Sequence, residues 1–92
     1  MVYFRVRKSV PLSVRRQGYI YYKSLCYPEL PERAKRRIAE LCSLAGGEYA
    51  AALQEYVTTD RSATAVCLRH HISRGTLERA VRKYYRMWPR SL

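Results

Sequence analysis

The stretch SATAVCLRHHISRGTLERAVRKYYRMW, from Ser62 to Trp88, decides the fold of this chain. We predict that it forms two helices joined by a tight turn. Ser62 and Ser73 each stand just before a helical run, where a hydroxyl can accept a hydrogen bond from a free backbone N–H of the first turn. Apolar residues at helical spacing predict a buried side for the first helix. The expected members of that side are Ala65, Val66 and either Cys67 or His70.

The second helix of this stretch is long and has two unlike sides. The apolar side, which we expect to face the core, consists of Leu77, Val81, either Tyr84 or Tyr85, and Trp88. The opposite side carries Arg74, Gly75, Glu78, Arg79, Arg82, Lys83 and Arg86. Pro89 ends the helix, because proline lacks the backbone N–H that a helix interior needs.

Two short helices in this arrangement are typical of a helix-turn-helix, whose second helix lies in the DNA major groove with its first residues at the base edges. Ile72 is expected to seal the turn. His71 stands where many such turns carry a glycine in the left-handed conformation, and histidine tolerates that conformation better than most residues do. The alternative is an ordinary helical hairpin with a solvated basic side. Because caps, turn and charge agree, we favour the DNA-binding interpretation.

The charge of the chain favours a polyanionic partner. The 92 residues include 18 Lys+Arg and 7 Asp+Glu, a net charge of +11. Residues 1–30 hold six basic residues and one acid (+5), residues 31–61 five of each (0), and residues 62–92 seven basic residues and one acid (+6). Two basic ends therefore flank a neutral middle. This distribution supports DNA contact by the helix-turn-helix and by the N-terminal region.

Composition also narrows the class of protein. A core of this size is marginally stable alone, so we expect one domain that forms a homodimer or higher oligomer. No apolar run approaches the roughly 18 residues of a membrane span, and the N-terminus does not resemble a signal peptide, so we expect a cytoplasmic protein without membrane contact. Three cysteines without a C-x-x-C pair argue against a disulfide framework or a zinc site. We expect Cys42 and Cys67 to be buried free thiols.

Nothing in the sequence indicates catalysis. We find no glycine-rich phosphate loop, no paired acids and no group of metal ligands. His70 and His71 are adjacent, and adjacent side chains of a helix point apart, so joint metal ligation is not expected. We therefore expect no enzymatic activity, no metal and no cofactor.

The rest of the chain completes an all-α prediction with an extended arm. Residues 1–29 are expected to form a basic, tyrosine-rich arm whose first nine residues are either a tail, which we prefer, or an edge strand. The arm's tyrosines could stack on nucleobases, but we favour packing on the core or on a second copy. Residues 30–92 are expected to be the helical domain. Its first helices should run from Leu30 to Gly46, with a solvated basic side over residues 33–37, and from Glu48 to about Thr58.

From about Pro31 to Trp88 the chain resembles the PapB-like transcriptional regulators of bacterial fimbrial (adhesin) operons. The resemblance lies in ALQEYVTTDRSATAVCLRHHIS and RGTLERAVRKYY. Its more specific features are the Val66-Cys67 pair and Gly75 after the turn. It implies a small oligomeric regulator that binds AT-rich repeated sites near fimbrial promoters and activates or represses according to occupancy.

A competing resemblance is to the KorA-type repressors of broad-host plasmids. The shared frame is Ala63-Thr64, Arg74-Gly75 and Ala80-Val81. This resemblance implies a dimer on palindromic operators. Both resemblances agree on double-stranded DNA as the partner.

The helix-turn-helix interpretation assigns a role to each candidate site residue. The residues expected at base edges are Arg74, Thr76, Arg79 and Glu78, with Gly75 between them. The helix start at Ser73 is expected to sit on a phosphate. The residues expected on other phosphates are Arg69, Arg82, Lys83 and Arg86. Other hypotheses are a non-specific architectural DNA binder, an RNA binder that uses the tyrosine-rich arm, and a protein-interaction module. The RNA hypothesis predicts that deletion of residues 1–29 abolishes binding.

Overall fold

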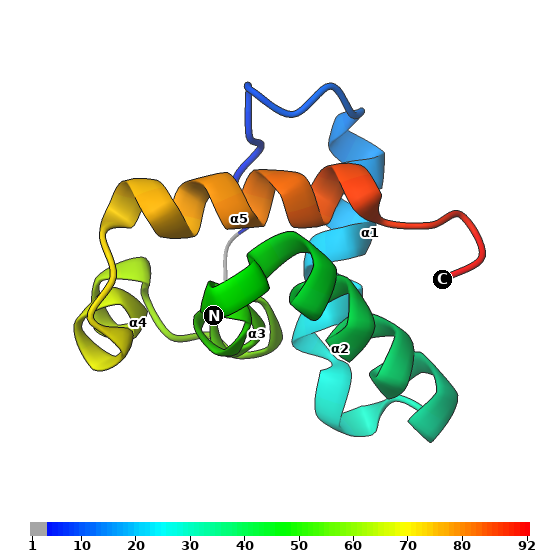
Figure 1. Cartoon of the computed structure of the whole chain (residues 1–92). Coiled ribbons are helices and arrows are strands. Elements are labelled where there is room, and N and C mark those ends of the chain that lie inside the picture. The colour runs from blue at the N-terminus through cyan, green and yellow to red at the C-terminus, as the bar shows by residue number, and fades with distance from the viewer. Residues whose placement is uncertain (1–3) are drawn as a thin grey trace.

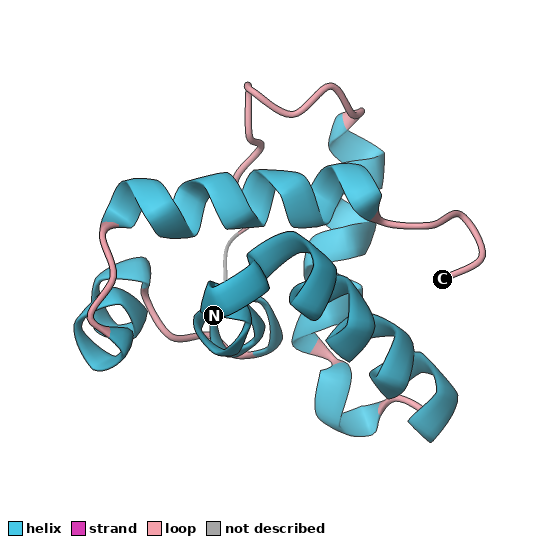
Figure 2. Cartoon of the chain, viewed as in Figure 1, coloured by secondary structure: helices cyan, strands magenta, loops and turns pink. Residues whose placement is uncertain are grey.

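A computed structural model describes residues 4–92, and within this range the chain is all-α, with no strand. Figures 1 and 2 show the helices crossing one another around a common centre, with α5 spanning the domain. The α-helices are α1 (Val14–Leu25), α2 (Glu32–Gly46), α3 (Ala50–Thr58), α4 (Ala63–His70) and α5 (Arg74–Met87). Short 3₁₀ turns precede α2 (Tyr27–Glu29) and α3 (Gly47–Tyr49).

The four predicted helices, α2 to α5, are confirmed. Pro31 precedes α2, whose first residue, Glu32, suits the positive end of the helix dipole. α2 ends at Gly46, as predicted, and Gly47 after it takes φ 57°, a positive value that glycine adopts without steric cost. The end of α5 also follows the prediction, since the helix ends at Met87, two residues before Pro89.

The expected extended arm over residues 1–29 is wrong from Val14 onward. Residues 14–25 form α1, which Ser13 caps by accepting a hydrogen bond from the Arg16 N–H at 3.1 Å. The buried residues of this helix are Gln17, Ile20 and Ser24. Two of these three are polar, so the buried side of α1 gave no apolar periodicity from which to predict a helix. Residues 1–3 of the arm lie outside the described residues.

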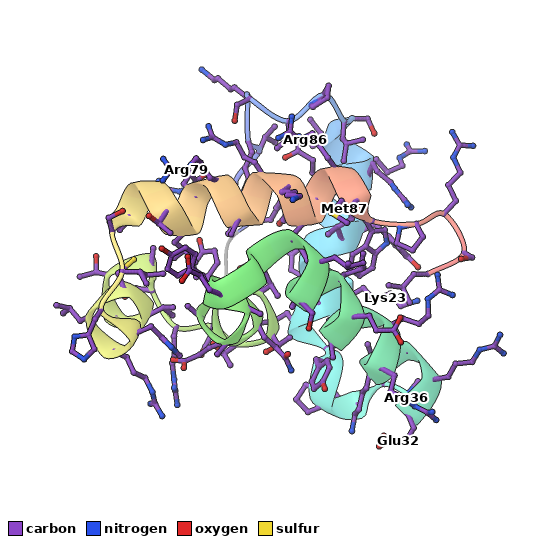
Figure 3. The ribbon with its side chains drawn as sticks, in the orientation of Figure 1. Lys23, Glu32, Arg36, Arg79, Arg86 and Met87 are labelled. Atoms are coloured by element: carbon purple, nitrogen blue, oxygen red, sulfur yellow. The ribbon has the colours of Figure 1, made fainter. Side chains whose placement is uncertain are left out.

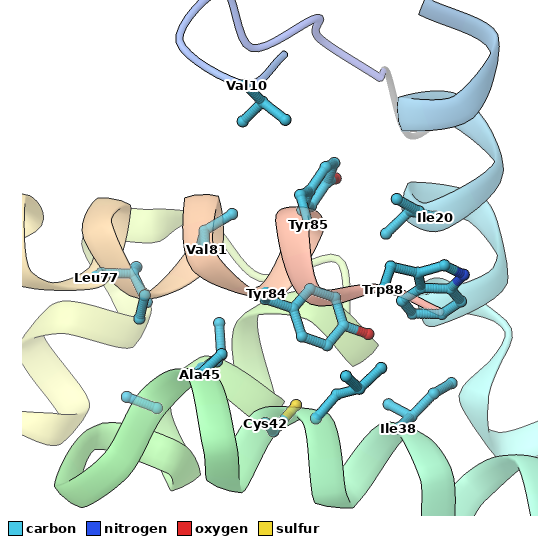
Figure 4. Close-up of a cluster of buried hydrophobic side chains, with 14 of the residues drawn as sticks. Val10, Ile20, Ile38, Cys42, Ala45, Leu77, Val81, Tyr84, Tyr85 and Trp88 are labelled. Atoms are coloured by element: carbon cyan, nitrogen blue, oxygen red, sulfur yellow. The ribbon is translucent and has the colours of Figure 1, made fainter. Parts of the chain in front are cut away.

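The core is built on the apolar side of α5. Figure 4 shows these side chains meeting residues of α2 from one direction and Ile20 of α1 from another. Tyr84 and Tyr85 are both buried, so α5 presents a wider buried side than the sequence pattern required. The Tyr84 hydroxyl lies 2.7 Å from the Ser24 hydroxyl, which satisfies both groups in the interior. Cys42 and Cys67 are buried free thiols, as predicted.

The segment before α1 is irregular, but it is fixed to the helices. Val10 inserts into the core with 4% of its surface exposed. The completely buried amide of Gln17 accepts a hydrogen bond from the Arg7 N–H (2.8 Å) and donates to the carbonyls of Arg7 and Leu12 (both 3.1 Å). One side-chain amide thus supplies partners that a helix or sheet would otherwise give these backbone groups.

Replacement of this amide should destabilise the domain. We expect Gln17→Leu, which keeps the side chain's size, to lower the free energy of unfolding by about 1–3 kcal/mol, because buried backbone groups lose their partners. Urea unfolding measures the change. Gln54→Leu is the matched control on α3, since Gln54 is only partly buried and its side chain makes none of these contacts. Equal effects of the two substitutions would contradict the role of Gln17.

Candidate nucleic-acid interface

The turn between α4 and α5 consists of three residues with well-defined roles. His71 adopts the left-handed conformation, with φ 55° and ψ 47°, as predicted. The N–H of Ile72 donates to the carbonyl of Cys67 at 3.1 Å, which closes the end of α4. The Ile72 side chain is half-buried against the core. The chain can therefore reverse within one turn and start α5 at Ser73.

Both predicted serine caps are present. Ser62 accepts a hydrogen bond from the Ala65 N–H at 3.1 Å, and Ser73 accepts one from the Thr76 N–H at the same distance. The Ser73 hydroxyl also donates to the Thr76 hydroxyl at 2.9 Å. Gly75 is exposed, and an added Cβ would meet only ordinary contacts there. The start of α5 is thus well formed and open to solvent, and Gly75 adds no side chain to it.

The cations of α5 gather on the side away from the core. A shallow hollow on this side is lined by Ser9, Arg79, Arg82, Lys83 and Arg86. Figure 3 shows Arg79 and Arg86 on the side of α5 that faces away from α2 and α3. Arg79 donates to the Thr76 hydroxyl at 3.4 Å, so its side chain lies back toward the start of the helix. Arg74 donates to Thr64 of α4 at 3.3 Å.

Glu78, which was predicted to lie at base edges, has a partner within the domain. Its carboxylate forms an ion pair with the guanidinium of Arg7, which also donates to the Tyr56 hydroxyl at 3.3 Å. The guanidinium lies 5.7 Å from the centre of the Tyr85 ring. Burial, the largest single influence, lowers the pKa of Arg7, but the Glu78 carboxylate together with Tyr56 and Tyr85 outweighs burial, so the pKa lies above its usual value. Glu78 is therefore already engaged, and its charge is neutralised within the domain.

Arg69 also lies apart from the hollow on α5. Its Nε is 3.5 Å from the carboxylate of Glu55 on α3. The same carboxylate accepts a hydrogen bond from Arg61 at 2.8 Å and lies 2.9 Å from the Nε2 of His70. Three basic side chains thus converge on one acid that links α3 to α4. The structure gives Arg69 a role between helices, which is separate from the phosphate contact predicted for it.

The Glu55 cluster predicts a pH-dependent contribution to stability. The hydrogen bonds from His70 and Arg61 lower the pKa of Glu55. A carboxylate with a lowered pKa stabilises the fold fully above its unfolded-state pKa of about 4.3, and the contribution is lost as the pH falls through the folded-state value.

We therefore expect Glu55→Gln to lower the free energy of unfolding at neutral pH. The gap between the variant and the wild type should close as the pH falls below about 4. Urea unfolding at a series of pH values measures it, with Glu40→Gln on the exposed surface of α2 as control. A gap that stays constant with pH would show that the charge of Glu55 is not responsible.

The buried side of α4 differs from the prediction in one residue. Val66 and Cys67 are buried, but Ala65 is exposed. His70 is half-buried against Glu55, which accounts for its position at the helix end. The inward side of α4 is therefore narrower than the sequence suggested.

The tyrosines of the N-terminal region are divided between packing and exposure. Tyr21 packs on Phe4 with ring centres 5.5 Å apart, while Tyr19 and Tyr22 remain 43% and 48% exposed. Because α1 supplies Gln17 and Ile20 to the core, deletion of residues 1–29 would remove part of the core. That deletion therefore cannot separate loss of RNA binding from loss of folding.

No family model matches the chain, and neither the curated proteins nor the solved structures include a significant match. Within residues 4–92 no group of three or more His, Cys, Asp or Glu side chains is placed to hold a metal ion. No helix in the same range has the length and apolar character needed to cross a membrane.

Proposed function

We propose that the chain is a sequence-specific DNA-binding regulator in which α4 and α5 form a helix-turn-helix and α5 enters the major groove. The observation that carries this proposal is the basic hollow on the free side of α5, which follows a capped and exposed helix start. A helix that buries one side in the core and carries cations along the other can rest on phosphates while its first residues meet base edges.

The positions of the α5 residues suggest two roles, base reading near the helix start and phosphate binding further along. Arg74, Thr76 and Arg79 lie at or near the helix start, where base edges are read. Arginine can pair with guanine through two hydrogen bonds, worth about 1–3 kcal/mol against a wrong base. Cations further along the helix would hold phosphates and fix the position on the duplex. Glu78 is left out of this division because Arg7 engages its carboxylate.

The proposed regulon follows from the resemblance to PapB-like regulators. In that proposal the chain acts as an oligomer on AT-rich repeated sites at the promoter of a fimbrial or adhesin operon. The KorA-type alternative keeps the same reading helix and differs in the operator, which would be a palindrome bound by a dimer. Operator geometry therefore distinguishes the two.

Selection of bound duplexes from a random pool tests the proposal. At about 0.15 M salt, screening over about 8 Å suppresses loose electrostatic capture. Enrichment of repeated AT-rich sites would favour the fimbrial regulator, and a palindrome with half-sites about one helical turn apart would favour the plasmid type. A pool without enrichment would contradict sequence-specific binding and leave α5 as a phosphate-holding surface.

Two single substitutions separate base reading from phosphate contact. We expect Arg79→Ala to weaken binding to the selected site by about 1–3 kcal/mol more than binding to random duplex, because a base contact is lost. Lys83→Ala should weaken both by the same factor, because phosphates carry no sequence information. Titration of labelled duplexes measures both. Equal losses on the two duplexes for Arg79→Ala would refute the assignment of Arg79.

A further inference from the structure

The segment before α1 lies on the free side of α5. Arg7 pairs with Glu78, and Ser9 accepts a contact from the Arg82 guanidinium at 3.5 Å, so the segment crosses α5 over the turn between these two residues. Figure 1 shows it running behind α5 and over its edge to reach α1. Its place is therefore beside the surface that the proposed function assigns to DNA.

Two hollows flank this segment and share one residue. Ser9 closes the hollow that holds four cations of α5. A second hollow is lined by the segment itself, including Arg5 and Lys8, together with Arg74 and Glu78 of α5. The segment thus joins the start of α5 to its later turns.

The segment's three basic residues have different surroundings. Arg7 is turned inward and neutralises the one acid of α5, which would otherwise repel a phosphate. Arg5 and Lys8 are exposed, and within residues 4–92 neither forms an ion pair with a carboxylate. The fold therefore adds two solvated cations to a surface that is already basic.

The backbone of this segment is held in place before any ligand binds. Val10 is anchored in the core, and Gln17 binds the N–H and the carbonyl of Arg7. A cation on a fixed backbone loses less conformational entropy on binding than a cation on a loose tail. This position suits a contact that recurs at a fixed place on a duplex.

We propose, on the basis of the proposed function, that residues 5–9 form a second DNA-contact element. Arg5 and Lys8 bind backbone phosphates beside the groove that α5 enters. The Ser9 hydroxyl and the cations of α5 form a binding site, or seat, for a further phosphate. Arg7 and Gln17 are positioning residues, because they hold the segment without touching DNA.

The dependence of affinity on salt tests this element. Each phosphate contact contributes about 0.9 to the slope of log affinity against log salt. The full chain carrying Arg5→Ala and Lys8→Ala should therefore show a slope on random duplex that is smaller by about 1.8. The matched control is Arg33→Ala with Arg36→Ala, which removes two exposed cations from α2. It should keep the wild-type slope, and both double variants should unfold at the wild-type urea concentration.

A substitution at Ser9 tests the seat. Ser9→Glu places a carboxylate among the cations of α5 and should lower the slope by about one contact, 0.9. Ser43→Glu adds the same charge to the exposed surface of α2 and should change it little.

The outcomes separate the two proposals. If the wild type binds duplex and the Arg5 and Lys8 variant matches its α2 control, the second contact element is refuted while the role of α5 stands. If the wild type binds no duplex, both proposals fail. A reduced slope for the Arg5 and Lys8 variant alone supports the element.

Discussion

The burial of one side of α5 is the interaction on which the rest of the structure depends. It packs on α2, α3 and α4, and its Tyr84 hydroxyl meets Ser24 of α1, so its apolar residues form the centre of the core. The same burial fixes which residues remain outside. A regular helix that buries Leu77, Val81 and Tyr84 must present Arg79, Arg82 and Arg86 to solvent. The burial that drives folding therefore also determines where these cations lie.

A buried polar side chain fixes the backbone of the segment before α1 against the same core. Gln17 occupies a core position that an aliphatic residue would normally fill, and its amide holds the backbone on either side of Val10. Arg7 then reaches Glu78, which is 71 residues away in sequence. A region that resembles a tail by composition is in this way fixed beside α5.

Much of the fold could be predicted because its signals are local. The serine caps and the left-handed turn at His71 each depend on a few neighbouring residues, and apolar spacing located the buried side of α5. The failures have a common cause in tertiary contacts. Polar Gln17 and Ser24 hide the buried side of α1. Glu78 and Arg69 pair with residues of other elements, so the sequence pattern of a single helix could not reveal these ion pairs.

The most direct test of the central claim is a map of the surface that contacts DNA. In an NMR titration of the ¹⁵N-labelled chain with duplex, amide shifts should change most in α5 from Ser73 to Arg86 and in residues 5–9. The basic side of α2, at residues 33–37, should change little. The largest shift changes on α2, with α5 unaffected, would contradict the account, because the other large group of cations would then be the binding surface.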